Sequence, residues 1–221
     1  GKVTNMRYMF KDATVFNGDI SEWNVAEVTD MSAMFADEAS WRAGPPAFNG
    51  DISKWNVAKV TNMGSMFSSA TAFSGDISKW NVAKVTHMSG MFFRATAFSG
   101  DISKWNVAEV TDMSDMFVGA TAFDSDISKW NVAMVTDMSD MFRDATAFNG
   151  DISKWNVQNV TNMERMFSGA TAFNREPLSA WTPNNVTNIT GMFSGATATG
   201  PDDYVYSWKR VGINPDDAFS R

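Results

Sequence analysis

The 221-residue sequence contains no cysteine and only one histidine, His87. Without thiols the chain forms neither disulfide bonds nor thiolate metal sites, and a single imidazole excludes histidine-based triads and multi-histidine metal sites. A glycine-rich phosphate loop is also missing from the sequence. These absences predict a protein that is not an enzyme and holds no cofactor or metal, with His87 as a solvent-exposed substitution.

The chain also lacks an excess of positive charge. It has 18 basic and 25 acidic residues, which gives a formal net charge of −7. Proteins that follow nucleic-acid phosphates concentrate basic residues on one face, so a nucleic-acid partner is not expected. No run of about 18 apolar residues occurs either, which predicts that no segment spans a membrane.

What the chain does contain is a repeated unit of 25 residues. Asp76–Gly100 reads DISKWNVAKVTHMSGMFFRATAFSG, and close copies follow as Asp101–Ser125 and Asp126–Gly150. A unit of this length cannot bury its apolar face alone, so about eight units are expected to stack around a shared core. The phrase V-T-x-M-x-x-M-F starts at Val3, Val28, Val60, Val85, Val110, Val135 and Val160, and in altered form at Val186.

Two periodicities alternate within each unit. In Asp76–Val82 the apolar residues Trp80 and Val82 lie two apart, which predicts a short half-buried strand. The following apolar residues recur at intervals of three and four, which predicts a short helix or 3₁₀ turn with Thr86 as its N-cap. These residues are Val85, Met88, Met91, Phe92 and Ala95.

The unit FNGDISKWNV…VTNMxxMF closely resembles the bacterial surface-protein 26-residue repeat, also described as the BspA-like leucine-rich-repeat family. The resemblance implies an α/β fold: a leucine-rich-repeat-like right-handed solenoid of strand, turn and short helix. We expect this solenoid over residues 1–200, with an insertion at 36–47, and a C-terminal cap over 201–221 that uses Tyr204–Trp208. Family members are displayed on microbial surfaces and implicated in adhesion and protein binding.

The methionine and tryptophan rows each allow two interpretations. Of 16 methionines, all but Met134 occupy the two repeated positions. They can form a promiscuous binding groove, but their helical spacing with Val and Phe favours a stacked core. The tryptophans can stack sugars or bases, but they share a face with Val, which favours an internal ladder.

Charged residues also recur once per unit. The aspartates that begin each unit, such as Asp76 and Asp101, are interpreted as turn caps, with calcium binding as the alternative. Three residues later a lysine row follows, which can receive a sulfated or carboxylated glycan or simply balance the aspartate charge. This row is Lys54, Lys79, Lys104, Lys129 and Lys154.

Two departures from the repeat add candidate sites. The insertion Ala36–Ala47 carries Trp41 and Arg42, residue types enriched in binding hot spots, and is either a recognition loop or a neutral excursion. Three N-x-Thr sequons are glycosylation candidates in a secreted eukaryotic protein, although the repeat itself contains Asn-Val-Thr. Their asparagines are Asn159, Asn185 and Asn188.

These features predict a non-enzymatic adhesion-type module, extracellular or on a cell surface, that binds a protein or glycan through its stacked units. A structural subunit that bridges components of a larger assembly is the first alternative. An ice-binding array is a weaker one, suggested by threonine rows such as Thr61, Thr86 and Thr111.

Overall fold

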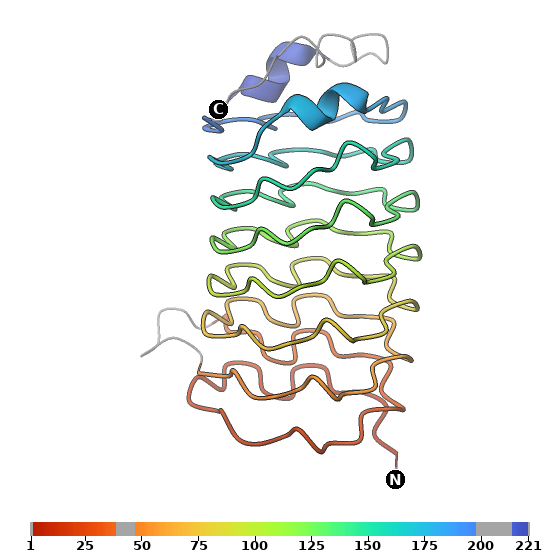
Figure 1. Ribbon diagram of the computed structural model, residues 1–221, viewed down its shortest axis with the longest axis vertical. Coiled ribbons are helices and arrows are strands. Elements are labelled where there is room, and N and C mark those ends of the chain that lie inside the picture. Colours follow the sequence, from red (N-terminus) through yellow and green to blue (C-terminus); the bar gives the residue numbers. More distant parts are fainter. Residues whose placement is uncertain (1, 39–46, 198–213, 221) are drawn as a thin grey trace.

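The computed structural model describes residues 2–38, 47–197 and 214–220. The chain winds into repeat-length turns, here called coils, which stack along the long axis of the molecule (Figure 1). Colour advances from red to blue coil by coil, so coils adjacent in sequence are adjacent in space, and the two termini lie at opposite ends. The right-handed sense and the leucine-rich-repeat class stay predictions.

Neighbouring coils are joined by isolated parallel β-bridges at the variable position of V-T-x-M. Around each bridge the backbone forms a short ladder: Thr111 N–H donates to Thr86 O at 3.0 Å, and Met88 N–H donates to Asp112 O at 3.2 Å. This ladder keeps the eight coils in register. The bridged residues are Asn5, Asp30, Asn62, His87, Asp112, Asp137, Asn162 and Asn188.

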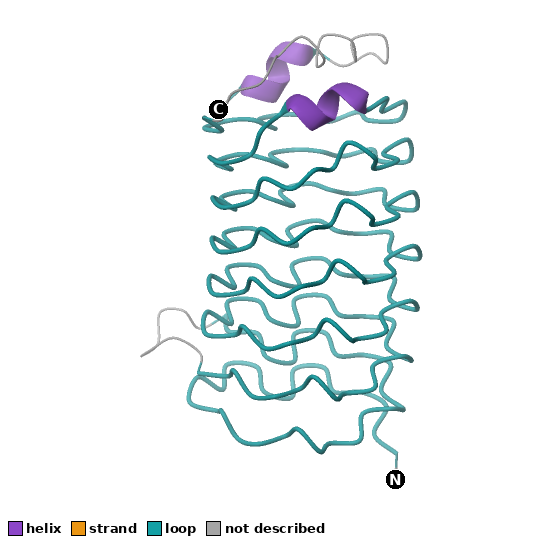
Figure 2. Ribbon diagram, viewed as in Figure 1, coloured by secondary structure: helices purple, strands orange, loops and turns teal. Residues whose placement is uncertain are grey.

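The strand predicted at the start of each unit is not formed in the described coils. The only regular elements described are two 3₁₀ helices, η1 (Glu176–Ala180) and η3 (Pro215–Phe219); Figure 2 shows the coils as loop and turn. In place of a strand, Asp76–Val82 closes a turn, with Trp80 N–H donating to Ile77 O at 3.1 Å. Turns alternate buried and exposed side chains as a strand does, which explains the misleading pattern.

Of the two alternatives predicted over Val85–Ala95, a short helix or 3₁₀ turns, the helix is not formed and the chain makes turns. Alternate amides donate within the coil, as in Met91 N–H to Met88 O at 3.1 Å, while those between them donate to the next coil. Gly90 and Arg94 adopt left-handed φ values of 61° and 53°, which no α-helix accommodates. Successive three-residue turns put apolar side chains on one side at the same spacing as a helix.

Aspartate and asparagine side chains cap these turns, as predicted for the aspartate row. The Asp76 carboxylate accepts from Ser78 N–H at 2.9 Å, and the Asn81 amide oxygen accepts from Ala83 N–H at 3.2 Å. The Asp112 carboxylate does the same for Ser114 N–H at 2.9 Å. Up to three such caps per coil satisfy amides that have no partner in a neighbouring coil.

The core consists of ladders of methionine, phenylalanine and tryptophan. The predicted interior position of the methionines is confirmed, with Met113 and Met116 fully buried. Phe92 stacks on Phe98 of its own coil at 3.9 Å and on Phe117 of the next at 5.7 Å, between ring centroids. From Trp55 to Trp181 the indoles of this row also donate to the preceding coil, as in Trp80 Nε1–H to Ile52 O at 3.1 Å, and they are buried, which confirms the internal tryptophan ladder.

The two ends of the stack differ. At the C-terminal end η3 lies against the eighth coil (175–197), with Ala218 buried and its carbonyl accepting from Phe193 N–H at 2.8 Å. At the N-terminal end the first coil (2–18) has no covering element among the described residues. The predicted contributions of Trp41, Arg42 and Tyr204–Trp208 lie outside the described residues.

Candidate functional site

The predicted lysine row lies on the outside of the stack. All five side chains are exposed, and each follows a turn capped by the preceding aspartate, so successive coils repeat them in register. We call this row the lysine surface. Its residues are Lys54, Lys79, Lys104, Lys129 and Lys154.

Only one member of the lysine surface forms an ion pair within 4 Å among the described residues. Lys54 Nζ lies 3.2 Å from the Glu22 carboxylate, and both side chains are largely exposed. The other four ammonium groups have no carboxylate at that distance in the described part of the chain. They therefore remain able to bind an anionic partner.

The aspartates three residues before these lysines are held by the backbone. Hydrogen bonds from the Ser78 side chain and amide lower the pKa of Asp76, and Lys79 contributes a smaller Coulombic effect. The same serine interactions lower the pKa of Asp101 and Asp126. The aspartate row thus acts as turn caps, and its link to the lysines is minor.

A different acidic cluster lies on the Met-rich side of the coils. Asp115 is half-buried, and this burial raises the pKa of its carboxyl, with the nearby Asp140 carboxylate adding to the rise. Asp140 is itself paired with Arg143 at 2.6 Å. Asp115 and Asp140 belong to successive repeats, so the sequence of a single unit does not reveal their interaction.

We expect Asp115→Asn to stabilise the chain at neutral pH by about 0.5 kcal/mol, the scale of a solvent-screened charge interaction. Asparagine also tolerates the left-handed φ of 57° found here. The pKa of Asp115 is higher in the folded chain than in the unfolded chain, where an aspartate has a pKa of about 3.9. Asp115 therefore destabilises the folded state increasingly as the pH rises above that value. Urea melts at neutral and acidic pH measure this gain, which should vanish below that window.

Asp144→Asn is the matched control, since Asp144 has the same φ of 57° but is exposed and lies 3.9 Å from Arg143. It should show no gain at any pH. An equal gain at both positions would assign the effect to the backbone and not to the acidic cluster.

The three predicted sequon asparagines differ in accessibility. Asn159 and Asn185 are exposed, and their side-chain amides donate to Ala133 O at 2.7 Å and Gln158 O at 2.8 Å of the preceding coil. Asn188 is partly buried and donates to the Glu164 carboxylate at 3.0 Å. Asn159 and Asn185 are therefore more accessible to glycosylation than Asn188.

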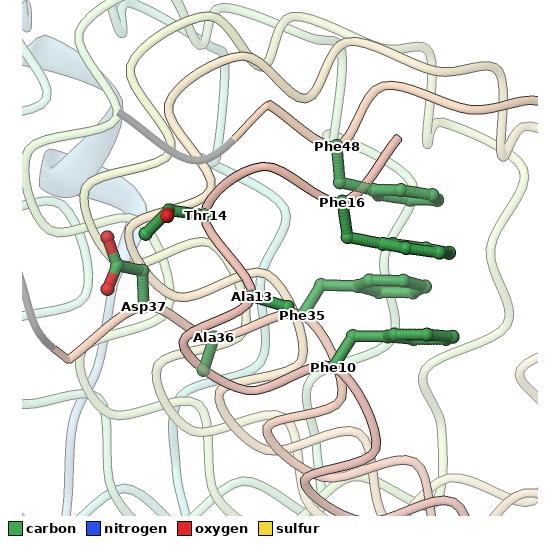
Figure 3. A pocket seen from close by; sticks show the side chains of 8 residues that line it. All are labelled: Phe10, Ala13, Thr14, Phe16, Phe35, Ala36, Asp37 and Phe48. Carbon is green, nitrogen blue, oxygen red and sulfur yellow. The ribbon is translucent and has the colours of Figure 1, made fainter. Parts of the chain in front are cut away.

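A small pocket lies beside the insertion, between the first two coils (Figure 3). Four phenylalanine rings stack along it, with centroids 4.0 Å apart in the pairs Phe10–Phe16 and Phe35–Phe48. Its free volume of about 10 Å³ is at the lower limit for one water molecule. Packing, and not ligand binding, explains this arrangement.

Sequence reasoning missed an apolar surface on the first coil. Among the described residues, large exposed hydrophobic side chains occur in the first coil and at Trp23 of the second coil, with Met134 as the exception. The sequence contained a signal for Val3, Met9 and Trp23, which occupy positions that are buried in other units. We call this surface the first-coil face; it comprises Val3, Tyr8, Met9, Val15 and Trp23.

Across the described residues, no group of three or more His, Asp or Glu side chains is arranged to hold a metal ion. The same part of the chain contains no helix with the length and apolar character needed to cross a bilayer.

Comparison with known protein families identifies a family model that matches the repeats. The family model described as "Mycoplasma protein of unknown function, DUF285" matches residues 1–104, 43–123 and 97–208. The chain belongs to the DUF285 family. The overlapping DUF285 matches agree with a repeat protein, whereas membership in the BspA-like family stays a prediction. A search of curated proteins finds no match.

Proposed function

We propose that this DUF285 chain is a non-enzymatic, adhesion-type module, secreted or displayed on a cell surface, that binds an anionic glycan through the lysine surface. The observation that carries the proposal is the row of ammonium groups at Lys79, Lys104, Lys129 and Lys154, which form no ion pair with any described residue. Because four successive coils repeat a lysine at the same position, the row has the periodicity suited to a polymer with regularly spaced charges.

The scaffold supports this function in two ways. The lysine stems start from turns that the backbone and the aspartate caps hold in place, so the ammonium groups are presented from a rigid base. The overall net charge of −7 disfavours general attraction of polyanions, and salt should weaken binding at the row strongly. Sulfated or carboxylated glycans offer charges of the required sign.

The test measures binding of the full chain to a sulfated glycosaminoglycan, with neutral dextran as the control polymer. Lys104→Glu removes one attraction and adds one repulsion, together about 1.4 kcal/mol, which lowers affinity about ten-fold. Lys84→Glu makes the same charge change at an exposed position on another row and should leave affinity unchanged. Equal losses in both variants would refute the lysine surface as the site.

A structural role as a subunit that bridges a larger assembly is the second candidate. The backbone bridges that join successive coils favour it, because such a column suits a spacer between larger components. Ice binding receives less support, since the Thr86 and Thr111 hydroxyls already donate to Thr61 O at 3.2 Å and Thr86 O at 3.3 Å.

A further inference from the structure

The side of the stack carries two parallel rows of opposite charge. One row is the lysine surface, and the other consists of the aspartates that lie three residues before its lysines, all of them exposed. We call the two rows together the charged stripe. It has as many carboxylates as ammonium groups, so the net charge of −7 arises outside it. Its aspartates are Asp51, Asp76, Asp101, Asp126 and Asp151.

The two rows of the charged stripe run straight along the stack. Each lysine is followed directly by a buried tryptophan, so the tryptophan ladder records the geometry beneath the stripe. The ring centroids of Trp55 and Trp80 lie 6.5 Å apart with an angle of 2° between the rings, and Trp130 and Trp155 repeat both values. A constant step with little twist lets a second straight stripe lie alongside over its whole length.

The charges of the stripe are not neutralised within one chain. Hydrogen bonds from Ser78 dominate the lowering of the pKa of Asp76, Lys79 adds a smaller Coulombic effect, and the neighbouring Asp101 carboxylate opposes both. The lysines from Lys79 to Lys154 form no ion pair within 4 Å with any described residue. Each row therefore repels itself along the stack and offers its charges to a complementary surface.

We propose that the charged stripe of one chain binds the charged stripe of a second copy, side by side and with the two stacks parallel. A two-fold axis parallel to the long axis of the stack (Figure 1) places the aspartate row of each copy opposite the lysine row of the other. A two-fold axis across the stack would instead set aspartates against aspartates. Opposite charges facing each other select the first arrangement.

The ends of the stripe favour one register of the two copies. In the second coil Glu22 takes the place of the lysine, and in the eighth coil Ala180 does. With equal coils facing each other, all lysine-bearing coils find a partner, whereas a shift by one coil leaves one of them in each copy opposite Glu22 or Ala180. The contact is therefore isologous and closes as a dimer.

Sedimentation velocity of the full chain, without any glycan, tests the proposal. Exposed ion pairs are individually weak and screened by salt, so a dimer should form with rising concentration in low salt and dissociate as salt is added. Lys104→Glu sets like charges opposite each other at two symmetry-related places, so the dissociation constant should rise about ten-fold or more. Lys84→Glu, the same charge change on another exposed row, should leave it unchanged.

A mixture of two variants tests which rows face each other. Asp101→Lys alone should also weaken the dimer, but an equal mixture with Lys104→Glu should restore it, because position 101 of one copy faces position 104 of the other. Asp101→Asn separates charge from turn capping, since an asparagine caps the same kind of turn at Asn81. It should weaken the dimer without lowering the stability of the chain.

The proposal is overturned if the chain stays monomeric in low salt, if Lys84→Glu weakens the dimer as much as Lys104→Glu, or if the mixture stays as weak as its components. Pairing of the stripes does not depend on glycan binding. Glycan binding by a chain that never dimerises would support the proposed function and overturn this inference alone.

Discussion

Trp105→Ala is expected to lower the free energy of unfolding by about 3–5 kcal/mol, the usual cost of truncating a buried tryptophan. Trp105 is 4% exposed, its ring centroid lies 6.4 Å from that of Phe92, and its indole donates to Ile77 O at 3.1 Å. Alanine leaves a cavity between two coils that the flanking ladders cannot close. Guanidinium denaturation measures the loss.

The repeat supplies a matched control in Trp23, which occupies the same position of the unit. Trp23 is 39% exposed and has no described coil before it, so Trp23→Ala should cost only about 1 kcal/mol, a fraction of full side-chain burial. Trp105→Phe separates packing from hydrogen bonding. It should cost less than Trp105→Ala, because Ile77 O still accepts from Trp80 N–H. Equal losses at Trp23 and Trp105 would contradict the inter-coil role of the indole.

Removal of one whole repeat, residues 101–125, should leave a folded chain. Gly100 then joins Asp126, and the amides of Met88 and Phe92 meet the carbonyls of Asp137 and Met141 in place of those they lose. Each coil contacts only its neighbours, so stability changes by one coil's share. The denaturant m-value should fall by about an eighth, because it scales with the surface exposed on unfolding.

Removal of residues 101–113, about half a repeat, should instead prevent folding. This shorter deletion places the tryptophan row of one part of the stack against the methionine row of the other, and the bridges lose their register. Circular dichroism and a cooperative melt distinguish the two outcomes. If the whole-repeat deletion also unfolds the chain, coil-to-coil contacts do not account for its stability.

The stacking of the coils and the buried rows of methionine and tryptophan were predictable because the same residues recur in each unit. Met113 and Trp105 recur with their neighbours in unit after unit, and a residue type that recurs at one position of a stack indicates one environment. The aspartate caps were predictable for a similar reason, since Asp76 and Ser78 lie two residues apart and the interaction is local.

The secondary structure was not predictable in this way. Spacings of three and four residues fit a helix and a series of turns equally well, and the choice depends on where the amides donate. Here Phe92 N–H donates to Met116 of the next coil, a partner invisible within one unit. Arg94 gives no local signal for its left-handed φ of 53° either, because arginine does not favour that region.

The candidate site was predictable only in part. Exposure of Lys79 and Lys104 follows from their place between buried residues, whereas the pairing of Lys54 with Glu22 depends on which coil lies beside it. The exposed side chains of the first-coil face could be recognised from the repeat, whereas the direction of each inter-coil hydrogen bond could not. The residue types of Asn5–Lys11 do not reveal whether their backbone donates or accepts hydrogen bonds at the junction between coils.

The direction of these hydrogen bonds also determines how the molecule responds to force. They run from coil to coil along the axis that separates the two termini (Figure 1), so tension applied at the ends loads one junction after another. Each coil that peels away lengthens the chain by about 85 Å, because an extended residue spans up to about 3.4 Å. Under load the stack would act as an extensible tether that yields in equal steps.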